Sequence, residues 1–106
     1  MGGRSDDSPG MEKARAFVER RMQETGIVPI AGVSKQEFDF SPRGSERKLK
    51  GINFLGTIKG KTTPEKYIVV TAHYDHDGLR NGQIYNGADD NASGTAALFA
   101  IARYFK

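Results

Sequence analysis

The chain has 106 residues, with 16 lysines and arginines against 13 aspartates and glutamates, and its net charge is +3 at pH 7. This length allows a single domain with a modest core, and an apolar share of 37% is ordinary for globular proteins and too high for a wholly disordered chain. Cysteine is absent, which excludes disulfides and thiolate metal sites, so any metal must be held by His, Asp or Glu.

Charge and hydropathy also narrow the possible partners. Much of the basic excess lies in RGSERKLK, residues 43–50, where no aromatic residue is interleaved with the charges. This pattern favours a solvated turn over a nucleic-acid surface. No apolar run approaches the length of a membrane span, and no charged-then-apolar signal sequence opens the chain. We therefore expect neither a nucleic-acid nor a membrane partner, and the compartment stays open.

The first ten residues, MGGRSDDSPG, are rich in Gly, Ser and Asp and predict a flexible leader over residues 1–10. A helix is expected to follow, with Ser8 as its cap, Pro9 in its first turn and Gly26 at its end. Its apolar residues recur at helical spacing and would form one buried face: Met11, Ala14, Val18 and Met22.

Two segments of alternating polarity come next, KQEFDFS at 35–41 and KGINFLGTIKG at 50–60. Phe38 and Phe40 share one face of the first segment, as in a strand exposed on its other side. The second segment places three apolar residues on one face: Ile52, Phe54 and Ile58. Turn-forming residues separate the two segments, namely Pro42, Gly44 and Ser45. An antiparallel hairpin is the expected result.

The run YIVVTA, residues 67–72, is continuously apolar and predicts a strand buried on both faces. A loop rich in Gly, Asn and Asp follows, and NASGTAALFAIARYFK, residues 91–106, predicts a closing helix. Apolar residues lie nearly all round this helix, so it should be covered on more than one side. The expected order is helix-strand-strand-strand-helix, which is typical of an α/β layer fold.

His73 and Asp75 lie two residues apart where the predicted buried strand ends. Side chains at this spacing point to the same face of a strand, with Cα atoms about 6.6 Å apart. A zinc-binding imidazole usually donates its second ring N–H to a carboxylate, which fixes the tautomer. We therefore interpret His73 as a metal ligand and Asp75 as the group that orients it.

Asp89 and Asp90 lie among small residues just ahead of the closing helix. The positive end of a helix favours carboxylates, so on their own these aspartates are best explained as helix caps. His73 on its own is best explained as an ordinary polar residue at a strand end. The metal interpretation gains weight because both features occur within one short span.

Two blocks carry a resemblance to a known family, VVTAHYDHDG at 69–78 and YNGADDNASGTAALFAIAR at 85–103. Together they resemble metallopeptidase family M28, the di-zinc aminopeptidases, and NFLGTIKG and the early GR extend the similarity more loosely. The resemblance implies that His73 binds one zinc ion, that Asp75 orients it, and that Asp90 bridges two zinc ions. It further implies a cis peptide bond between Asp90 and Asn91, and it places His76, Asp89 and Asn91 near the site.

The resemblance also implies a fold and an activity. Residues 11–106 would be the N-terminal part of a single peptidase domain, built on a mixed β-sheet flanked by helices as in zinc peptidases and phosphorylases. The activity would be exopeptidase action on peptides by a metal-activated water, aminopeptidase-like, although some relatives are carboxypeptidase-like. Export to the periplasm or medium would be compatible with it.

The family pattern is incomplete in these 106 residues. Such enzymes need a pair of adjacent glutamates, one of them the general base, and then another Asp and another His. Every glutamate here precedes His73, and no Asp, Glu or His follows Asn91. We therefore expect a truncated and inactive part of a longer peptidase, without a general base, that binds zinc weakly. We also expect self-association through the apolar C-terminal helix.

Other interpretations remain open. The chain could be a non-catalytic binding module on a peptidase-like scaffold, or HYDHD could be a solvated acidic turn without a metal. His73, Asp75 and His76 also fit the last three positions of the metallo-β-lactamase motif H-x-H-x-D-H, but Thr71 stands where its first histidine should be. A phosphate-binding loop is disfavoured, because Gly56 and Gly60 lie one residue too close together.

Overall fold

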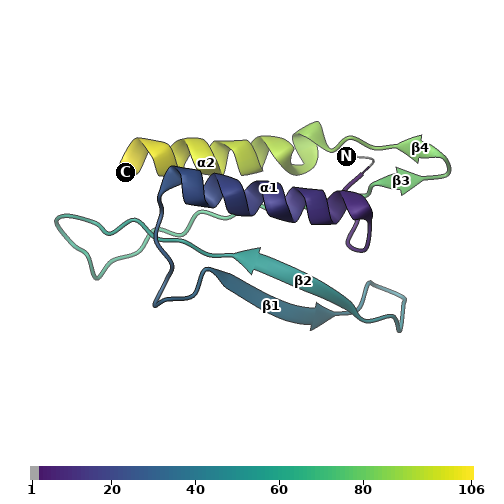
Figure 1. Cartoon of the computed structure of the whole chain (residues 1–106), viewed down its shortest axis with the longest axis horizontal. Coiled ribbons are helices and arrows are strands. Elements are labelled where there is room, and N and C mark those ends of the chain that lie inside the picture. Colours follow the sequence, from purple (N-terminus) through teal and green to yellow (C-terminus); the bar gives the residue numbers. More distant parts are fainter. Residues whose placement is uncertain (1–2) are drawn as a thin grey trace.

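The computed structural model describes residues 3–106 (Figure 1). Its elements are, in chain order, α1 (Pro9–Thr25), β1 (Lys35–Phe40), β2 (Leu49–Phe54), β3 (Leu79–Arg80), β4 (Gln83–Ile84), η1 (Ala88–Ala92) and α2 (Ser93–Phe105). The strands form two separate two-stranded antiparallel sheets, β1–β2 and β3–β4. The expected α/β class is confirmed at this level, whereas the described residues contain no larger mixed sheet.

Helix α1 has the limits that the sequence predicts, but Met22, expected on its buried face, is only partly buried. The Ser8 side chain accepts a hydrogen bond from the Met11 amide at 3.1 Å, Pro9 is the first helical residue, and Gly26 ends the helix with a positive φ of 68°. This left-handed conformation carries little steric cost for glycine. Pro9 and Gly10 thus belong to α1, although they fall inside the leader that the sequence predicts.

The predicted hairpin is also confirmed, although β2 ends at Phe54 rather than continuing to Ile58. Phe38 lies opposite Gly51 in the register, and a Cβ atom on that glycine would be only 2.3 Å from the Phe38 ring. The Phe38 ring can therefore lie directly on the sheet at Gly51, because glycine has no Cβ atom to clash with it. An ion pair of 2.6 Å between Lys35 and Glu19 joins the hairpin to α1.

The predicted buried strand at 67–72 is wrong. No strand forms there, and Ile68 and Val69 are 95% and 79% exposed. A buried strand requires hydrogen-bonded neighbours and cover on both faces. Neither sheet among residues 3–106 includes this segment, so its apolar side chains stay in solvent.

We predict only a loop in this region from the sequence, whereas the structure contains a small hairpin, β3–β4. Its turn is Asn81–Gly82, and both residues have positive φ values, 50° and 73°. Asn-Gly is a strong sequence signal for a tight hairpin turn, because both residues tolerate this conformation. The hairpin separates the two parts of the candidate site along the chain.

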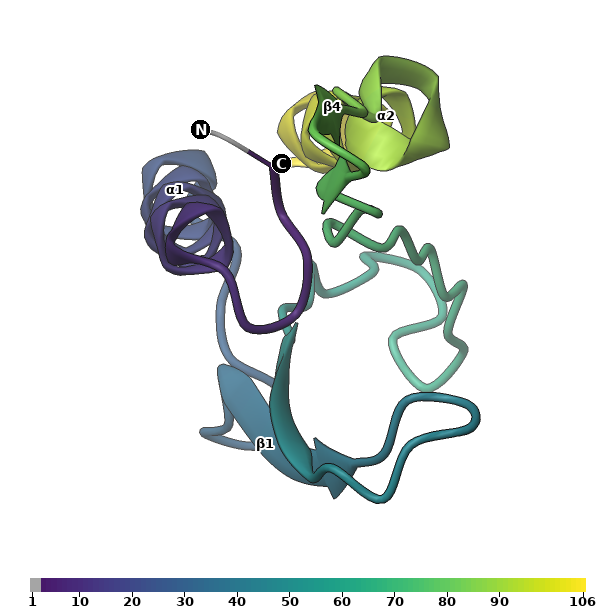
Figure 2. The same cartoon turned by 90° about the vertical axis from the view of Figure 1, so that its right-hand side faces the viewer.

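The core lies where α1 meets α2. Figure 2 shows the two helices next to each other above the β1–β2 hairpin, and α1 contacts both α2 and β2. Among residues 3–106 the buried apolar side chains all come from these two helices: Met11, Ala14, Val18, Phe99 and Ala102. The closing helix is thus confirmed, but it is covered on one side only, and Tyr104 and Phe105 at its end are exposed.

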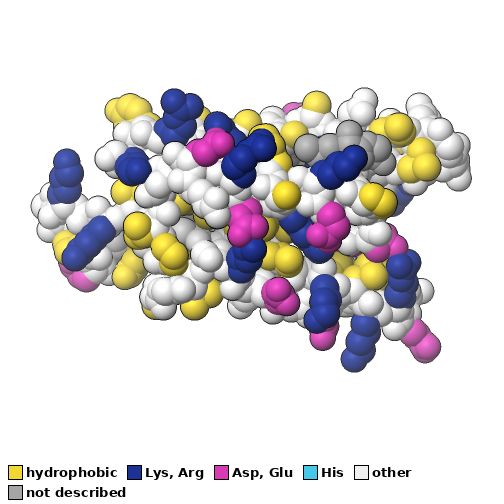
Figure 3. All heavy atoms as spheres, in the orientation of Figure 1, with side chains coloured by type: hydrophobic (Ala, Val, Ile, Leu, Met, Phe, Trp, Pro, Cys, Tyr) yellow, Lys and Arg dark blue, Asp and Glu magenta, His cyan; other side chains and the backbone are white. Residues whose placement is uncertain are grey.

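The molecule is open for its size. Its radius of gyration is 15.4 Å, whereas a compact domain of this length has about 13 Å. Its accessible surface is 8020 Å², against about 5,800 Å² for a typical globular monomer of the same mass. Figure 3 shows apolar atoms at the surface between interspersed basic and acidic side chains. None of the helices described combines the length and hydropathy of a membrane span.

Candidate metal centre

The two parts of the predicted site come together around the imidazole of His73. Its Nδ1 atom lies 3.0 Å from Oδ1 of Asp75, and its Nε2 atom lies 3.1 Å from Oδ1 of Asp90. Asp75 is two residues away, whereas Asp90 precedes α2 and reaches the imidazole from the other side of the β3–β4 hairpin. His73 is thus held between two carboxylates from two segments of the chain.

Hydrogen bonds to the backbone on either side fix the position of the segment that carries His73. The Thr95 hydroxyl in the first turn of α2 donates a hydrogen bond of 3.0 Å to the His73 carbonyl. The hydroxyl of Tyr74 donates one of 2.6 Å to the Ile52 carbonyl, which anchors the next residue on β2. Burial raises the pKa of the Tyr74 phenol, so this hydroxyl keeps its proton well into alkaline solution. The segment is therefore tied to both α2 and the hairpin.

Asp90 is placed by the irregular turn η1. The peptide bond between Asp90 and Asn91 is cis, as the family resemblance implies. The Asn91 side chain accepts a hydrogen bond from the Gly94 amide at 3.1 Å, and the Asp89 carbonyl accepts one from the Ser93 hydroxyl at 2.9 Å. The Asn91 side chain thus bonds to an amide in the first turn of α2, whereas the Asp90 carboxylate faces His73.

A cavity of about 260 Å³ opens at this centre. It is lined by Ser5, Asp6, His73, Asp75, His76, Asp77, Arg80 and Asp90. Burial and the nearby Asp75 and Asp7 carboxylates raise the pKa of Asp6. The sequence interpretation missed Asp6, Asp77 and Arg80, and Asp6 and Ser5 come from the segment that was expected to be a leader. Asp89 and Asn91 do not line this cavity.

His76 also lines the cavity, but its ring makes different contacts from the ring of His73. Its Nδ1 atom accepts a hydrogen bond from the Gly78 amide at 3.0 Å. A Cβ atom on Gly87 would lie 2.3 Å from the His76 ring, so the ring packs directly on that glycine. His76 therefore closes one wall of the cavity and serves as a natural comparison for His73.

The donor set around His73 fits a divalent cation. If Nδ1–H donates to Asp75, the lone pair on Nε2 faces an oxygen of Asp90, and these two acceptors repel unless a proton or a cation lies between them. Two ligands of a tetrahedral zinc ion, each about 2.1 Å from the metal, are about 3.4 Å apart. The observed separation of 3.1 Å between Nε2 and Asp90 is close to that value.

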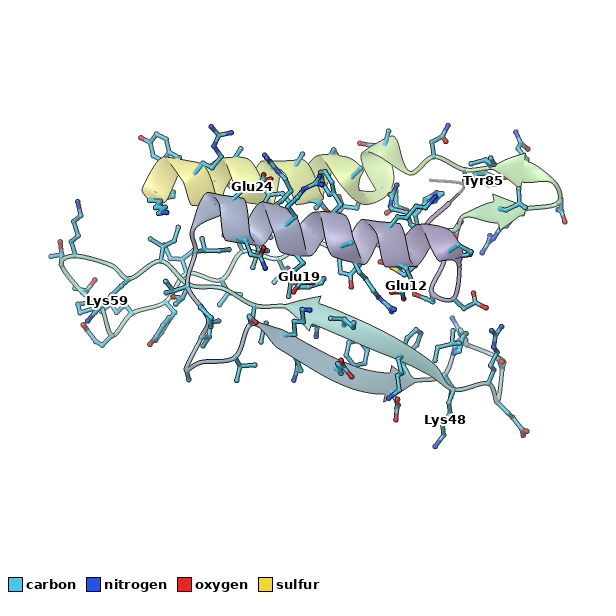
Figure 4. The ribbon with its side chains drawn as sticks, viewed as in Figure 1. Glu12, Glu19, Glu24, Lys48, Lys59 and Tyr85 are labelled. Atoms are coloured by element: carbon cyan, nitrogen blue, oxygen red, sulfur yellow. The ribbon has the colours of Figure 1, made fainter. Side chains whose placement is uncertain are left out.

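The ligand set is nevertheless short. Among residues 3–106, no three His, Asp or Glu side chains are grouped to hold a metal ion, because Asp75 faces the opposite ring nitrogen of His73. Glu12, Glu19 and Glu24 follow one another along α1 in Figure 4, and no glutamate of the described chain lines the cavity. The described residues thus offer two candidate ligands, His73 and Asp90, and no glutamate base at the cavity.

The chain is similar to known proteins. The profile of Peptidase family M28 matches residues 53–106, which include both segments of the candidate centre. Aminopeptidase YwaD of Bacillus subtilis (strain 168) is 32% identical over 88 residues, which cover 74% of this chain and 18% of YwaD. The chain thus spans only a small part of that relative. No solved structure matches the chain.

Proposed function

The chain belongs to peptidase family M28, and from this membership we propose that it forms part of a zinc-dependent exopeptidase of the aminopeptidase kind, acting on peptides. In this proposal residues 11–106 are the N-terminal part of a single peptidase domain. The observation that supports it most is the imidazole of His73 held between the carboxylates of Asp75 and Asp90.

The three side chains have separate roles in this proposal. Asp75 accepts the Nδ1–H of His73, which fixes the ring and leaves the Nε2 lone pair for the metal. Asp90 offers its carboxylate on the other side of the same position, where it can be shared by two zinc ions. Zinc bound there would polarise the scissile carbonyl and lower the pKa of a water molecule. His76, Asp89 and Asn91 shape the surroundings of the site and do not bind the metal.

We further propose that the remaining ligands and the general base are supplied by residues outside these 106. A catalytic zinc ion usually has three protein ligands, and His73 and Asp90 provide two. Without a placed base, removal of a proton from the attacking water is not organised. The chain alone should therefore bind zinc weakly and hydrolyse no peptide, and robust turnover of peptide substrates by the purified chain would contradict this.

A zinc titration followed by NMR tests the metal site. The chain contains only two histidines, so the ring nitrogens of His73 and His76 can be resolved and assigned. We expect Nε2 of His73 to shift on addition of zinc while the ring of His76 changes little. If neither ring responds, a non-catalytic binding module becomes the better interpretation. The family match leaves the metallo-β-lactamase-like alternative without support.

We also propose that the chain self-associates through the exposed end of α2. Tyr104 is 83% exposed, and the neighbouring Ile101 and Phe105 are exposed as well. The excess surface of the molecule is consistent with burial of this patch in an assembly. Sedimentation velocity over a range of concentrations should show a larger species at high concentration, and Tyr104→Lys should reduce it. A strictly monomeric wild-type chain would contradict the proposal.

A further inference from the structure

One side chain from the beginning of the chain bonds to both segments of the candidate centre. The Arg4 guanidinium donates a hydrogen bond of 2.9 Å from Nε to the Tyr74 carbonyl. It donates two more, of 3.1 Å each, from Nη1 to the Asn86 carbonyl and from Nη2 to the Gly87 carbonyl. The Arg4 carbonyl in turn accepts a hydrogen bond of 3.0 Å from the His76 amide.

These partners are next to the residues that would hold the metal. Tyr74 lies between His73 and Asp75, and Gly87 directly precedes the turn η1, which carries Asp90. Arg4 thus joins the two segments that face each other across the 3.1 Å contact between Nε2 of His73 and Asp90. In Figure 1 the first described residues run beside the base of the β3–β4 hairpin and the start of η1.

Close packing of the backbone holds Arg4 in this position. Gly3 has a φ of 95°, and a Cβ atom on it would lie 2.6 Å from the Cα atom of Gly78. Gly78 is buried, with a φ of 71°, and a Cβ atom there would lie 2.9 Å from the Ser5 hydroxyl oxygen. Glycine on both sides of this contact allows the beginning of the chain to lie against the loop after Asp75.

The chemistry of these contacts suits arginine and not lysine. The three acceptors are backbone carbonyls at different places, and a guanidinium has five N–H donors in a rigid planar fork. A lysine ammonium is a compact point charge on a flexible stem, and it cannot reproduce this fixed three-way geometry. A role that depended on positive charge alone would be retained by lysine, so the two residues can be distinguished.

We propose that Arg4 is a positioning residue of the metal centre: its guanidinium fixes the loop that carries His73 relative to the turn that carries Asp90. This inference rests on the proposed zinc site but concerns a residue that makes no contact with the metal. It makes the zinc affinity of the site depend on the beginning of the chain.

The test compares Arg4→Ala and Arg4→Lys with Arg43→Ala. Arg43 is exposed and has no hydrogen bond or ion pair with residues 3–106, so it controls for the loss of one positive charge. Zinc affinity is measured by calorimetry, and the ring signals of His73 are recorded by NMR in the metal-free chain at one fixed pH. Circular dichroism and the amide signals of α1 verify that each variant is folded.

We expect zinc affinity to fall about tenfold or more in both Arg4 variants, as for other groups that support a ligand, while Arg43→Ala resembles the wild type. The His73 ring signals should move in both Arg4 variants without metal. Should Arg4→Ala fail to fold, Arg4→Lys, which keeps the charge and the apolar stem, decides. Wild-type zinc affinity and ring signals in the Arg4 variants, wild-type zinc affinity of Arg4→Lys alone, or an equal loss of affinity in Arg43→Ala would each overturn the inference.

The two proposals can fail separately. If the wild-type chain binds no zinc, the proposed function fails, and the His73 ring signals of the metal-free variants then decide the role of Arg4. Unchanged ring signals in that case would also remove the positioning role. If the ring signals shift in the Arg4 variants and not in Arg43→Ala, the positioning role of Arg4 stands. It would then describe a structural coupling between the beginning of the chain and His73.

Discussion

Phe99→Ala is expected to lower the free energy of unfolding by about 3–5 kcal/mol, which is typical for removal of a buried phenylalanine ring. Phe99 is 5% exposed and is the largest of the five apolar side chains that are buried in the described part of the chain. Small domains have a total stability of about 5–15 kcal/mol, and a core this small should place the chain near the lower limit. We therefore expect the variant to retain at most about 2 kcal/mol and to unfold at a much lower urea concentration than the wild type, as measured by circular dichroism.

Phe105→Ala is the matched control, because it removes the same side chain from the same helix at a position that is 68% exposed. Phe105 contacts the Tyr104 ring edge to face, with centroids 5.0 Å apart, and loss of such a contact costs about 1 kcal/mol. Similar urea midpoints for the two variants would show that the core does not lie between α1 and α2.

His73→Ala should have the largest effect on zinc binding. It removes the nitrogen ligand and leaves Asp90 as the remaining proposed ligand, so the loss should exceed that caused by any supporting group. Asp75→Asn removes only the carboxylate that accepts the Nδ1–H, and changes of this kind typically weaken metal binding by about 10–100-fold. The expected order of affinity, measured by competition with a fluorescent chelator, is wild type, then Asp75→Asn, then His73→Ala.

His76→Ala provides the control for this series. His76 lines the same cavity, but its ring accepts a hydrogen bond from the Gly78 amide and is not a proposed ligand. The variant should bind zinc within about threefold of the wild type, since it changes a wall of the cavity and leaves both ligands in place. A larger loss in His76→Ala than in His73→Ala would reverse the assignment of the two histidines.

Features set by neighbouring residues could be predicted from the sequence. The limits of α1 follow from Ser8, Pro9 and Gly26, which act on the backbone within a turn of where they stand. The pairing of His73 with Asp75 was also predictable, because side chains two residues apart lie on the same side of any extended segment. The contact between His73 and Asp90 came from the family resemblance, since spacing alone does not bring residues seventeen apart together.

Features that depend on distant partners could not be predicted in this way. The apolar run at 67–72 has the composition of a buried strand, but burial requires cover that its own residues cannot provide. Arg4 lies in a stretch rich in Gly, Ser and Asp, and its three acceptors are 70 or more residues away along the chain. The β3–β4 hairpin is a different case, because its turn residues Asn81 and Gly82 are a local signal. The prediction of a simple loop overlooked this signal.

The position of Gly3, Arg4 and Ser5 beside the cavity has a practical consequence for purification tags. An oligohistidine tag fused to the amino end would begin only a few residues from the candidate centre, and its imidazoles could act as extra zinc ligands. Apparent affinities measured with such a tag would then report a composite site. A tag after Lys106 avoids this, because the thirteen residues of α2 place that end about 20 Å away from the turn η1.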